Sequence, residues 1–208
     1  MLSSYIFIIL PFIVLLTGIL TFKKYKNSKL KYFLFFIFYA FLTELSSYYI
    51  GFILRKSTFL IYNIYILLST IFYLLLFYFY IKRNNFFIKL MLIIFVAFYL
   101  YNYIFIQNTL YTSQTNTLLL GSIFIIISAI FLFVELLNSD DILIINKLLL
   151  FWVSIGIFLF YVGIVPIFVM ADFLNYRGLF DYIILSLNII MYSCFVIGFI
   201  ISKKEYNI

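Results

Sequence analysis

The stretch YFLFFIFYAFLTELSSYYIGFIL, from Tyr32 to Leu54, decides how this chain folds. It runs for 23 residues with one charged side chain, Glu44, and it follows the lysine-rich segment KKYKNSKLK, from Lys23 to Lys31. A helix needs about 20 apolar residues to cross a hydrocarbon layer of about 30 Å. The stretch therefore predicts a membrane-spanning helix that begins beside a basic loop.

Six further runs have the same character, and together the seven predict an all-α polytopic membrane protein. They cover about 5–22, 32–54, 59–81, 86–106, 118–137, 148–170 and 180–202. The 208-residue chain is 67% hydrophobic and 10% charged, which is more apolar side chain than a soluble core of this size can bury. Unbroken runs favour a helical bundle over a barrel, whose strands would alternate. We expect a single seven-helix domain, 1–208, with no separate extramembrane domain.

The basic residues predict the orientation of the bundle. Eleven of the fourteen Lys and Arg residues fall on one side of the expected membrane, among them Lys23, Lys24, Lys26, Lys29, Lys31, Lys82 and Arg83. By the positive-inside rule, the N-terminus lies outside and the C-terminus lies in the cytoplasm, and we expect a multi-pass protein of the inner (cytoplasmic) membrane. The net charge of +7 then follows from topology and contact with anionic lipid, so no direct nucleic-acid partner is expected. The same basic loops are the expected surface for a cytoplasmic protein partner.

Two residue counts remove much enzyme chemistry. The chain has one cysteine, Cys194, and no histidine. An internal disulfide, a cysteine or histidine metal cluster and a histidine-dependent triad are therefore excluded. We expect no metal site.

Polar side chains inside the spans mark the expected site. Glu44 lies near the middle of the second span, where a charge costs about 2.5 kcal/mol or more. Ser47 and Tyr48 share its helix face. Further candidates are Tyr62, Asn63, Tyr65 and Ser69 on the third span and Asp181, Asn188 and Tyr192 on the seventh. Two interpretations stay open: hydrogen bonds that anchor the helices to one another, or an outward-opening pocket for a proton or ligand.

Four short motifs resemble a family of small seven-span membrane proteins of Bacteroidota. They are Phe41-Leu-Thr-Glu44-Leu-Ser-Ser-Tyr48, Leu60-Ile-Tyr-Asn63-Ile-Tyr65, Phe151-Trp152-Val-Ser-Ile-Gly156 and Leu187-Asn188-Ile-Ile. One branch of that family is the accessory membrane protein of type VI-B CRISPR systems, and the group is distantly opsin-like. The resemblance implies seven helices and an outside N-terminus. The seventh run has no lysine before Lys203, so the retinal of opsins is not expected as a cofactor.

Three functions follow as expectations. The first is a non-enzymatic accessory or signalling protein, whose cytoplasmic partner would be an RNA-guided nuclease in antiviral defence or a kinase. The second is a small transporter or channel in which Glu44 is the proton- or ion-linked site. The third is an intramembrane lipid hydrolase that uses Glu44 and Asp181 as acid and base. A homo-oligomer is compatible with all three.

Overall fold

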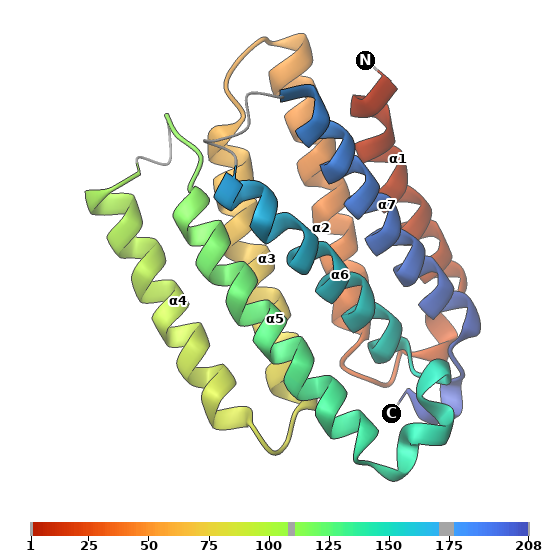
Figure 1. Ribbon diagram of the computed structural model, residues 1–208. Helices are drawn as coiled ribbons and strands as arrows, with labels where there is room; N and C mark the ends of the chain where they lie inside the picture. Colours follow the sequence, from red (N-terminus) through yellow and green to blue (C-terminus); the bar gives the residue numbers. More distant parts are fainter. Residues whose placement is uncertain (1, 108–110, 171–176, 208) are drawn as a thin grey trace.

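The computed structural model describes residues 2–107, 111–170 and 177–207, and these contain seven α-helices and no strand (Figure 1). The helices are α1 (Leu2–Leu20), α2 (Lys31–Tyr48), α3 (Phe59–Tyr80), α4 (Asn85–Phe105), α5 (Thr115–Leu137), α6 (Leu149–Met170) and α7 (Arg177–Ile201). A π-helical turn, η2 (Tyr49–Ile53), extends α2, and short 3-10 turns η1 (Phe22–Lys24), η3 (Asp140–Lys147) and η4 (Lys204–Tyr206) lie between or after the helices. Each predicted apolar run therefore corresponds to one helix, with ends that differ by a few residues.

Six of the helices are long and apolar enough to cross a membrane. They are α2 to α7, with α2 counted together with η2, and the described apolar part of α1, Tyr5–Leu20, is shorter. A backbone inside a helix satisfies its own hydrogen bonds, which is what a hydrocarbon layer demands. The chain therefore has the build of a multi-pass helical membrane protein.

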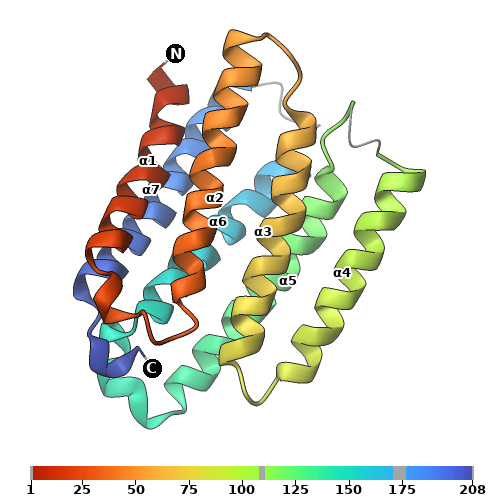
Figure 2. The same ribbon diagram turned by 180° about the vertical axis from the view of Figure 1, so that it is seen from behind.

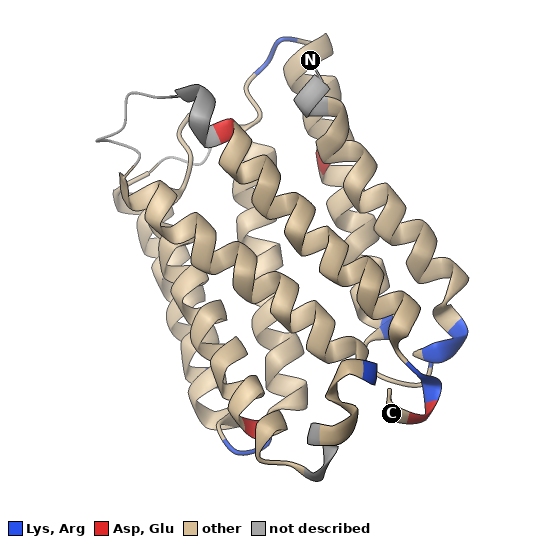
Figure 3. Cartoon of the chain, turned by 45° about the vertical axis from the view of Figure 1, so that its right-hand side comes forward, with Lys and Arg blue, Asp and Glu red and all other residues tan. Residues whose placement is uncertain are grey.

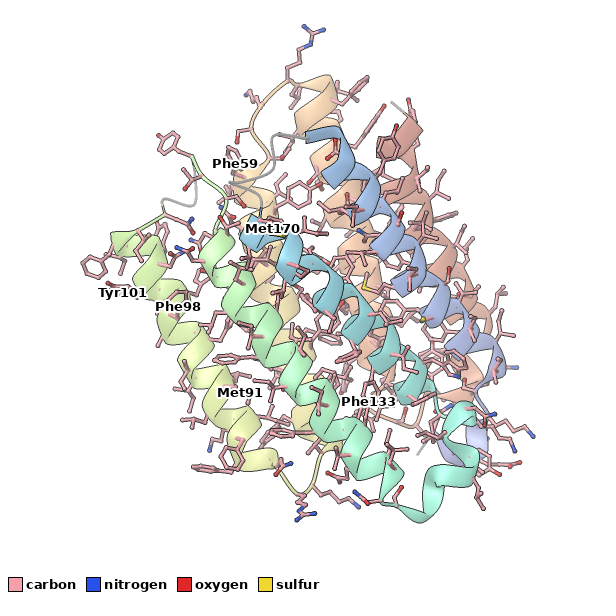
Figure 4. All side chains as sticks on the ribbon, viewed as in Figure 1. Phe59, Met91, Phe98, Tyr101, Phe133 and Met170 are labelled. Atoms are coloured by element: carbon pink, nitrogen blue, oxygen red, sulfur yellow. The ribbon has the colours of Figure 1, made fainter. Side chains whose placement is uncertain are left out.

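Six helices form a closed ring, and α4 lies outside it. Around the ring each helix contacts the next, in the order α1, α2, α3, α5, α6 and α7, and α7 returns to α1. α4 packs against α3 and α5 at one edge of the bundle (Figures 1 and 2). The labelled Tyr101 of α4 projects away from the other helices and is 52% exposed (Figure 4). Such outward apolar and aromatic side chains form the surface that lipid would cover.

Aromatic rings fill the centre of the ring of helices. Phe36 of α2 stacks on Phe72 of α3, with 4.4 Å between the ring centroids. Phe33 of α2 meets Phe195 of α7 edge-to-face at 5.0 Å. Each such pair contributes about 0.5–1.5 kcal/mol beyond the burial of its area. These contacts join α2, α3 and α7 in the interior of the bundle.

The contact between α6 and α7 is close because glycine faces it. A Cβ atom added to Gly156 would lie 2.9 Å from the backbone oxygen of Met191 and 3.1 Å from Cβ of Cys194. Small residues at a helix contact allow the backbones to approach closely. In lipid, where the hydrophobic effect does not drive helices together, the dispersion contacts formed in this way stabilise their association. Gly156 therefore fixes the spacing of these two helices.

The two termini lie at opposite ends of the bundle, and one end gathers most of the lysines (Figure 3). We call this the basic end; it contains η1, the connection from α3 to α4, η3 and the C-terminal segment. Tyr25 anchors it, since its buried hydroxyl donates to the Gly18 carbonyl at 2.6 Å and burial raises its pKa. The amide of Lys203 donates to the Lys147 carbonyl at 3.1 Å, which ties the C-terminal segment to the connection before α6. Arg55 and Lys56 lie at the other end.

Candidate ligand-binding site

A pocket of about 320 Å³ lies between α1, α2 and α3 in the half of the bundle away from the basic end. Glu44 and Ser47 line it from α2, together with Gly51 and Phe52 from η2 and Tyr62 from α3. Phe7 of α1, Tyr48 and Thr58 complete the lining. Residues 44, 47, 48 and 51 follow the three- and four-residue spacing of one helix face. The pocket is therefore built on the polar face of the second predicted span.

The Glu44 carboxylate is the one acidic group among the described lining residues. It accepts a hydrogen bond from the hydroxyl of Tyr62 at 3.3 Å, across the contact between α2 and α3. The hydroxyl of Ser47 is buried and faces the Tyr62 hydroxyl across the same contact.

Aromatic rings form the walls around this carboxylate. The ring of Tyr48 stacks on that of Phe52 with 5.2 Å between their centroids. The hydroxyl of Tyr48 donates to that of Tyr5 on α1 at 3.1 Å, which holds the ring in place. Aromatic faces attract cations, and a carboxylate in the same pocket adds to that attraction.

Tyrosine hydroxyls continue from the pocket toward the centre of the bundle. Tyr65 and Tyr192 lie near Glu44, and Tyr65 also lies near Tyr73 and Tyr161. The predicted site residue Ser69 is buried, donates to the Ile66 carbonyl at 3.3 Å, and faces Tyr161. The structure thus places Tyr65, Ser69 and Tyr192 behind the pocket and not in its wall.

Asn63 does not join the Glu44 pocket. Its amide donates to the Thr112 carbonyl at 2.8 Å, and its side-chain oxygen accepts from the backbone amide of Gln114 at 3.0 Å. Asn63 is one residue, or about 100° of helix, from Tyr62, so the two side chains leave α3 on different faces. Its place in the structure is a clamp between α3 and the start of α5.

That clamp belongs to a buried polar network whose other members were not predicted as site residues. Asn102 of α4 donates to both Gln107 and Thr117, at 3.0 Å in each case, and Thr117 donates to Gln114 at 3.1 Å. Three of these side chains come from, or border, the connection between α4 and α5, whose polar sequence is equally typical of a solvent-exposed loop. Asn102 is the residue from which this network could have been predicted, because a side-chain amide within an apolar run needs hydrogen-bond partners.

Two predicted residues of the seventh span also lie apart from the pocket lining. The amide of Asn188 donates to the Ile184 carbonyl of its own helix at 2.9 Å. Asp181 is exposed and is not among the residues that line the pocket. The structure therefore brings Glu44, Ser47, Tyr48 and Tyr62 together in one wall and leaves Asp181 and Asn188 out of it.

The seven basic candidates differ in what their side chains and backbone amides contact. Lys24 donates to the carbonyls of Phe199 and Ile200 at 3.3 and 2.6 Å, so it caps the end of α7. The backbone amides of Lys82 and Arg83 donate to Glu135 of α5, with the shortest distance 3.0 Å, while their side chains are exposed. The remaining four are Lys23, Lys26 and Lys29, which are exposed, and Lys31, which is half-buried.

No family model, curated protein or solved structure matches this chain. The family resemblance of the four motifs thus stays a prediction. Function has to be argued from the pocket and the basic end themselves.

Phe7, Phe52 and Thr58 are pocket residues that the sequence alone does not mark. Phe7 and Phe52 lie in apolar runs where the same residue type also covers lipid-facing surface, so composition cannot separate the two roles. Gly51 could have been predicted as a pocket residue, since it lies seven residues after Glu44 and therefore on the same helix face. A Cβ atom on Gly51 would lie 3.1 Å from the Thr58 side chain, so glycine allows this close approach.

Proposed function

We propose that this chain is a seven-span protein of the cytoplasmic membrane, with its basic end in the cytoplasm and its N-terminus outside. Two observations support this topology: eleven of fourteen basic residues belong to one side of the spans, and the termini lie at opposite ends of the bundle. The positive-inside rule then orients the chain, and an odd number of spans follows from the separated termini. In this orientation the Glu44 pocket lies in the outer half of the membrane.

The pocket is the receptor site of a non-enzymatic signalling or accessory protein, and its ligand is a small organic cation. The observation that carries this proposal is the single carboxylate of Glu44 within aromatic walls, in a pocket of about 320 Å³. Aromatic faces with one carboxylate suit a protonated or quaternary amine, since each ring adds about 0.5–1 kcal/mol at an exposed site.

The bundle below the pocket favours transduction over transport. Phe36, Phe72 and Tyr73 are packed ring against ring across α2 and α3. A bound cation changes the hydrogen bond between Glu44 and Tyr62, and with it the contact between α2 and α3. α2 begins at Lys31, and residues 25–30 join it to η1, so a shift of α2 moves the lysines that a cytoplasmic partner would contact.

The cytoplasmic partner has an acidic surface that matches Lys23, Lys26 and the neighbouring lysines. An RNA-guided nuclease is the candidate that the family resemblance implies, and a kinase is the other. Electrostatic matching of this kind steers association and makes it sensitive to salt. In a co-purification experiment, we expect the double variant Lys23→Glu and Lys26→Glu to lose the partner while its bundle remains folded.

Transport is the second candidate, and the tyrosine hydroxyls behind Glu44 favour it. Tyr65, Tyr73, Tyr161 and Tyr192 lie near one another behind the pocket. Intramembrane carboxylates with such neighbours occur on ion and proton pathways. In this alternative Glu44 is the ion- or proton-linked residue.

Choline added to the protein in lipid nanodiscs separates the two candidates. Transduction predicts that choline binding changes amide hydrogen exchange in residues 22–30 at the basic end, and that Glu44→Gln removes the change. Ser46→Ala is the matched control, because Ser46 is exposed on another face of the same helix turn. Choline flux into proteoliposomes would instead establish transport. Binding without exchange changes and without flux would contradict both.

A further inference from the structure

An apolar groove of about 460 Å³ runs between α2 and α3 on the half of the bundle near the basic end. Its walls include Tyr32, Phe35, Leu68, Leu75 and Phe79. Four of these five side chains are at least 43% exposed, and Leu75 is 36% exposed, so the groove opens on the outer surface of the bundle. Exposed apolar surface on the spans would face lipid chains, and here that surface is hollowed into a groove.

The groove ends in lysines. Lys29 lines the groove, with its ammonium 4.2 Å above the ring of Phe79. Lys31 lies next to it, with its ammonium 5.3 Å from the ring centroid of Tyr32. The aromatic rings hold both ammonium groups at the open end of the groove, where headgroups lie in a bilayer.

A smaller polar hollow of about 270 Å³ adjoins the groove at this end. It shares Lys29, Tyr32 and Phe79 with the groove and adds Lys31, Asn27 and Ser28. The described linings of both hollows contain no acidic side chain. The apolar groove is therefore continuous with the smaller hollow, which we call the cup and which offers lysine ammonium groups and hydrogen-bonding side chains.

We propose that the groove and the cup together bind one phospholipid with an anionic headgroup, from the leaflet at the basic end. One of its two acyl chains lies in the groove between α2 and α3, and the phosphate lies between Lys29 and Lys31. Basic pockets between transmembrane helices bind anionic headgroups in this way. The proposal depends on the membrane assignment and does not depend on the Glu44 pocket.

The bound lipid would also touch the element that carries the proposed signal. It contacts Lys31 and Tyr32, the first residues of α2, and it bridges α2 to Phe79 near the end of α3. An anionic lipid therefore stabilises one relative position of α2 and α3. Lipid composition at the basic end would tune the response of the bundle.

Native mass spectrometry of the protein in a neutral detergent tests the proposal with phosphatidylglycerol and phosphatidylcholine of identical chains. We expect one phosphatidylglycerol to remain bound under conditions that remove phosphatidylcholine. The pair Lys29→Gln and Lys31→Gln should weaken phosphatidylglycerol retention roughly thirtyfold, from about a fivefold attraction per basic residue. The control pair Lys23→Gln and Lys26→Gln removes the same charge from exposed lysines outside the groove, and should leave retention unchanged.

A second variant tests the groove without changing charge. Leu68→Trp or Leu75→Trp fills the exposed groove from its wall, and either should displace the lipid while both lysines remain. Equal retention of the two lipids, equal loss in both lysine pairs, or unchanged retention in the tryptophan variants would overturn the proposal. A dimer in place of a lipid adduct would also overturn it, because a second copy would then occupy the groove.

Discussion

Replacing Glu44 by glutamine should weaken the binding of choline about ten- to thirtyfold. Glu44 supplies the one carboxylate of the described pocket lining, and Tyr62 holds it at 3.3 Å. A quaternary ammonium seated against the Tyr62 ring would lie about 5 Å from that carboxylate, where an effective dielectric constant near 20 gives an attraction of about 3 kcal/mol. Contact with water at the pocket mouth reduces this to about 1.5–2 kcal/mol, which corresponds to the stated change in Kd.

Isothermal titration of nanodisc-embedded protein measures this change, and a neutral ligand provides the control. The carbon analogue of choline, 3,3-dimethylbutanol, has the same shape without the charge. We expect the wild-type pocket to prefer choline over this analogue and Glu44→Gln to lose the preference. A Kd for choline that is the same in wild type and Glu44→Gln would refute the electrostatic role of Glu44.

Three further predictions concern the contacts that hold the pocket and the bundle. Asn63→Leu should lower the free energy of unfolding by about 1–3 kcal/mol in a detergent melt, because the buried amide of Gln114 loses its acceptor; unchanged stability would contradict the clamp. Glu135→Ala should speed amide exchange at Lys82, whose amide donates to that carboxylate at 3.0 Å, and exchange at the wild-type rate would show that the contact is not made. Gly156→Ala should destabilise the protein by about 1–3 kcal/mol through a forced separation of α6 and α7, and a variant as stable as wild type would show that the helices are not this close.

The positions of the helices could be predicted from sequence because a bilayer constrains length so strongly. Each apolar run had to become a helix, since lipid leaves no partner for an unpaired backbone group. The order of the helices around the ring could not be predicted. Lipid-facing and helix-facing side chains are both apolar here, so α4 has no sequence signal that places it outside the ring.

In the candidate site, too, the residues on one helix face could be predicted and the contacts between helices could not. Glu44, Ser47 and Tyr48 follow from one helix face, and the structure brings Tyr62 to them from α3. Asn63 could not be placed from sequence, because its partners lie beyond the end of α4 and its face depends on helix rotation. Tertiary contacts, and not local spacing, decide which polar residue meets which.

Thiol labelling of a cysteine at position 58 tests the central claim most directly, that the pocket is polar, opens outward and prefers cations. Thr58 lines the pocket and is half-buried. Thr58→Cys is made in a Cys194→Ala background and treated from outside intact cells with membrane-impermeant methanethiosulfonates, one carrying trimethylammonium and one carrying sulfonate. Each rate is divided by the rate of the same reagent with a free thiol in solution. The cationic reagent should then keep an advantage, Glu44→Gln should remove it, and Ser46→Cys should remain unlabelled on its lipid-facing side. An unreactive cysteine at position 58, or equal normalised rates with both reagents, would contradict the account.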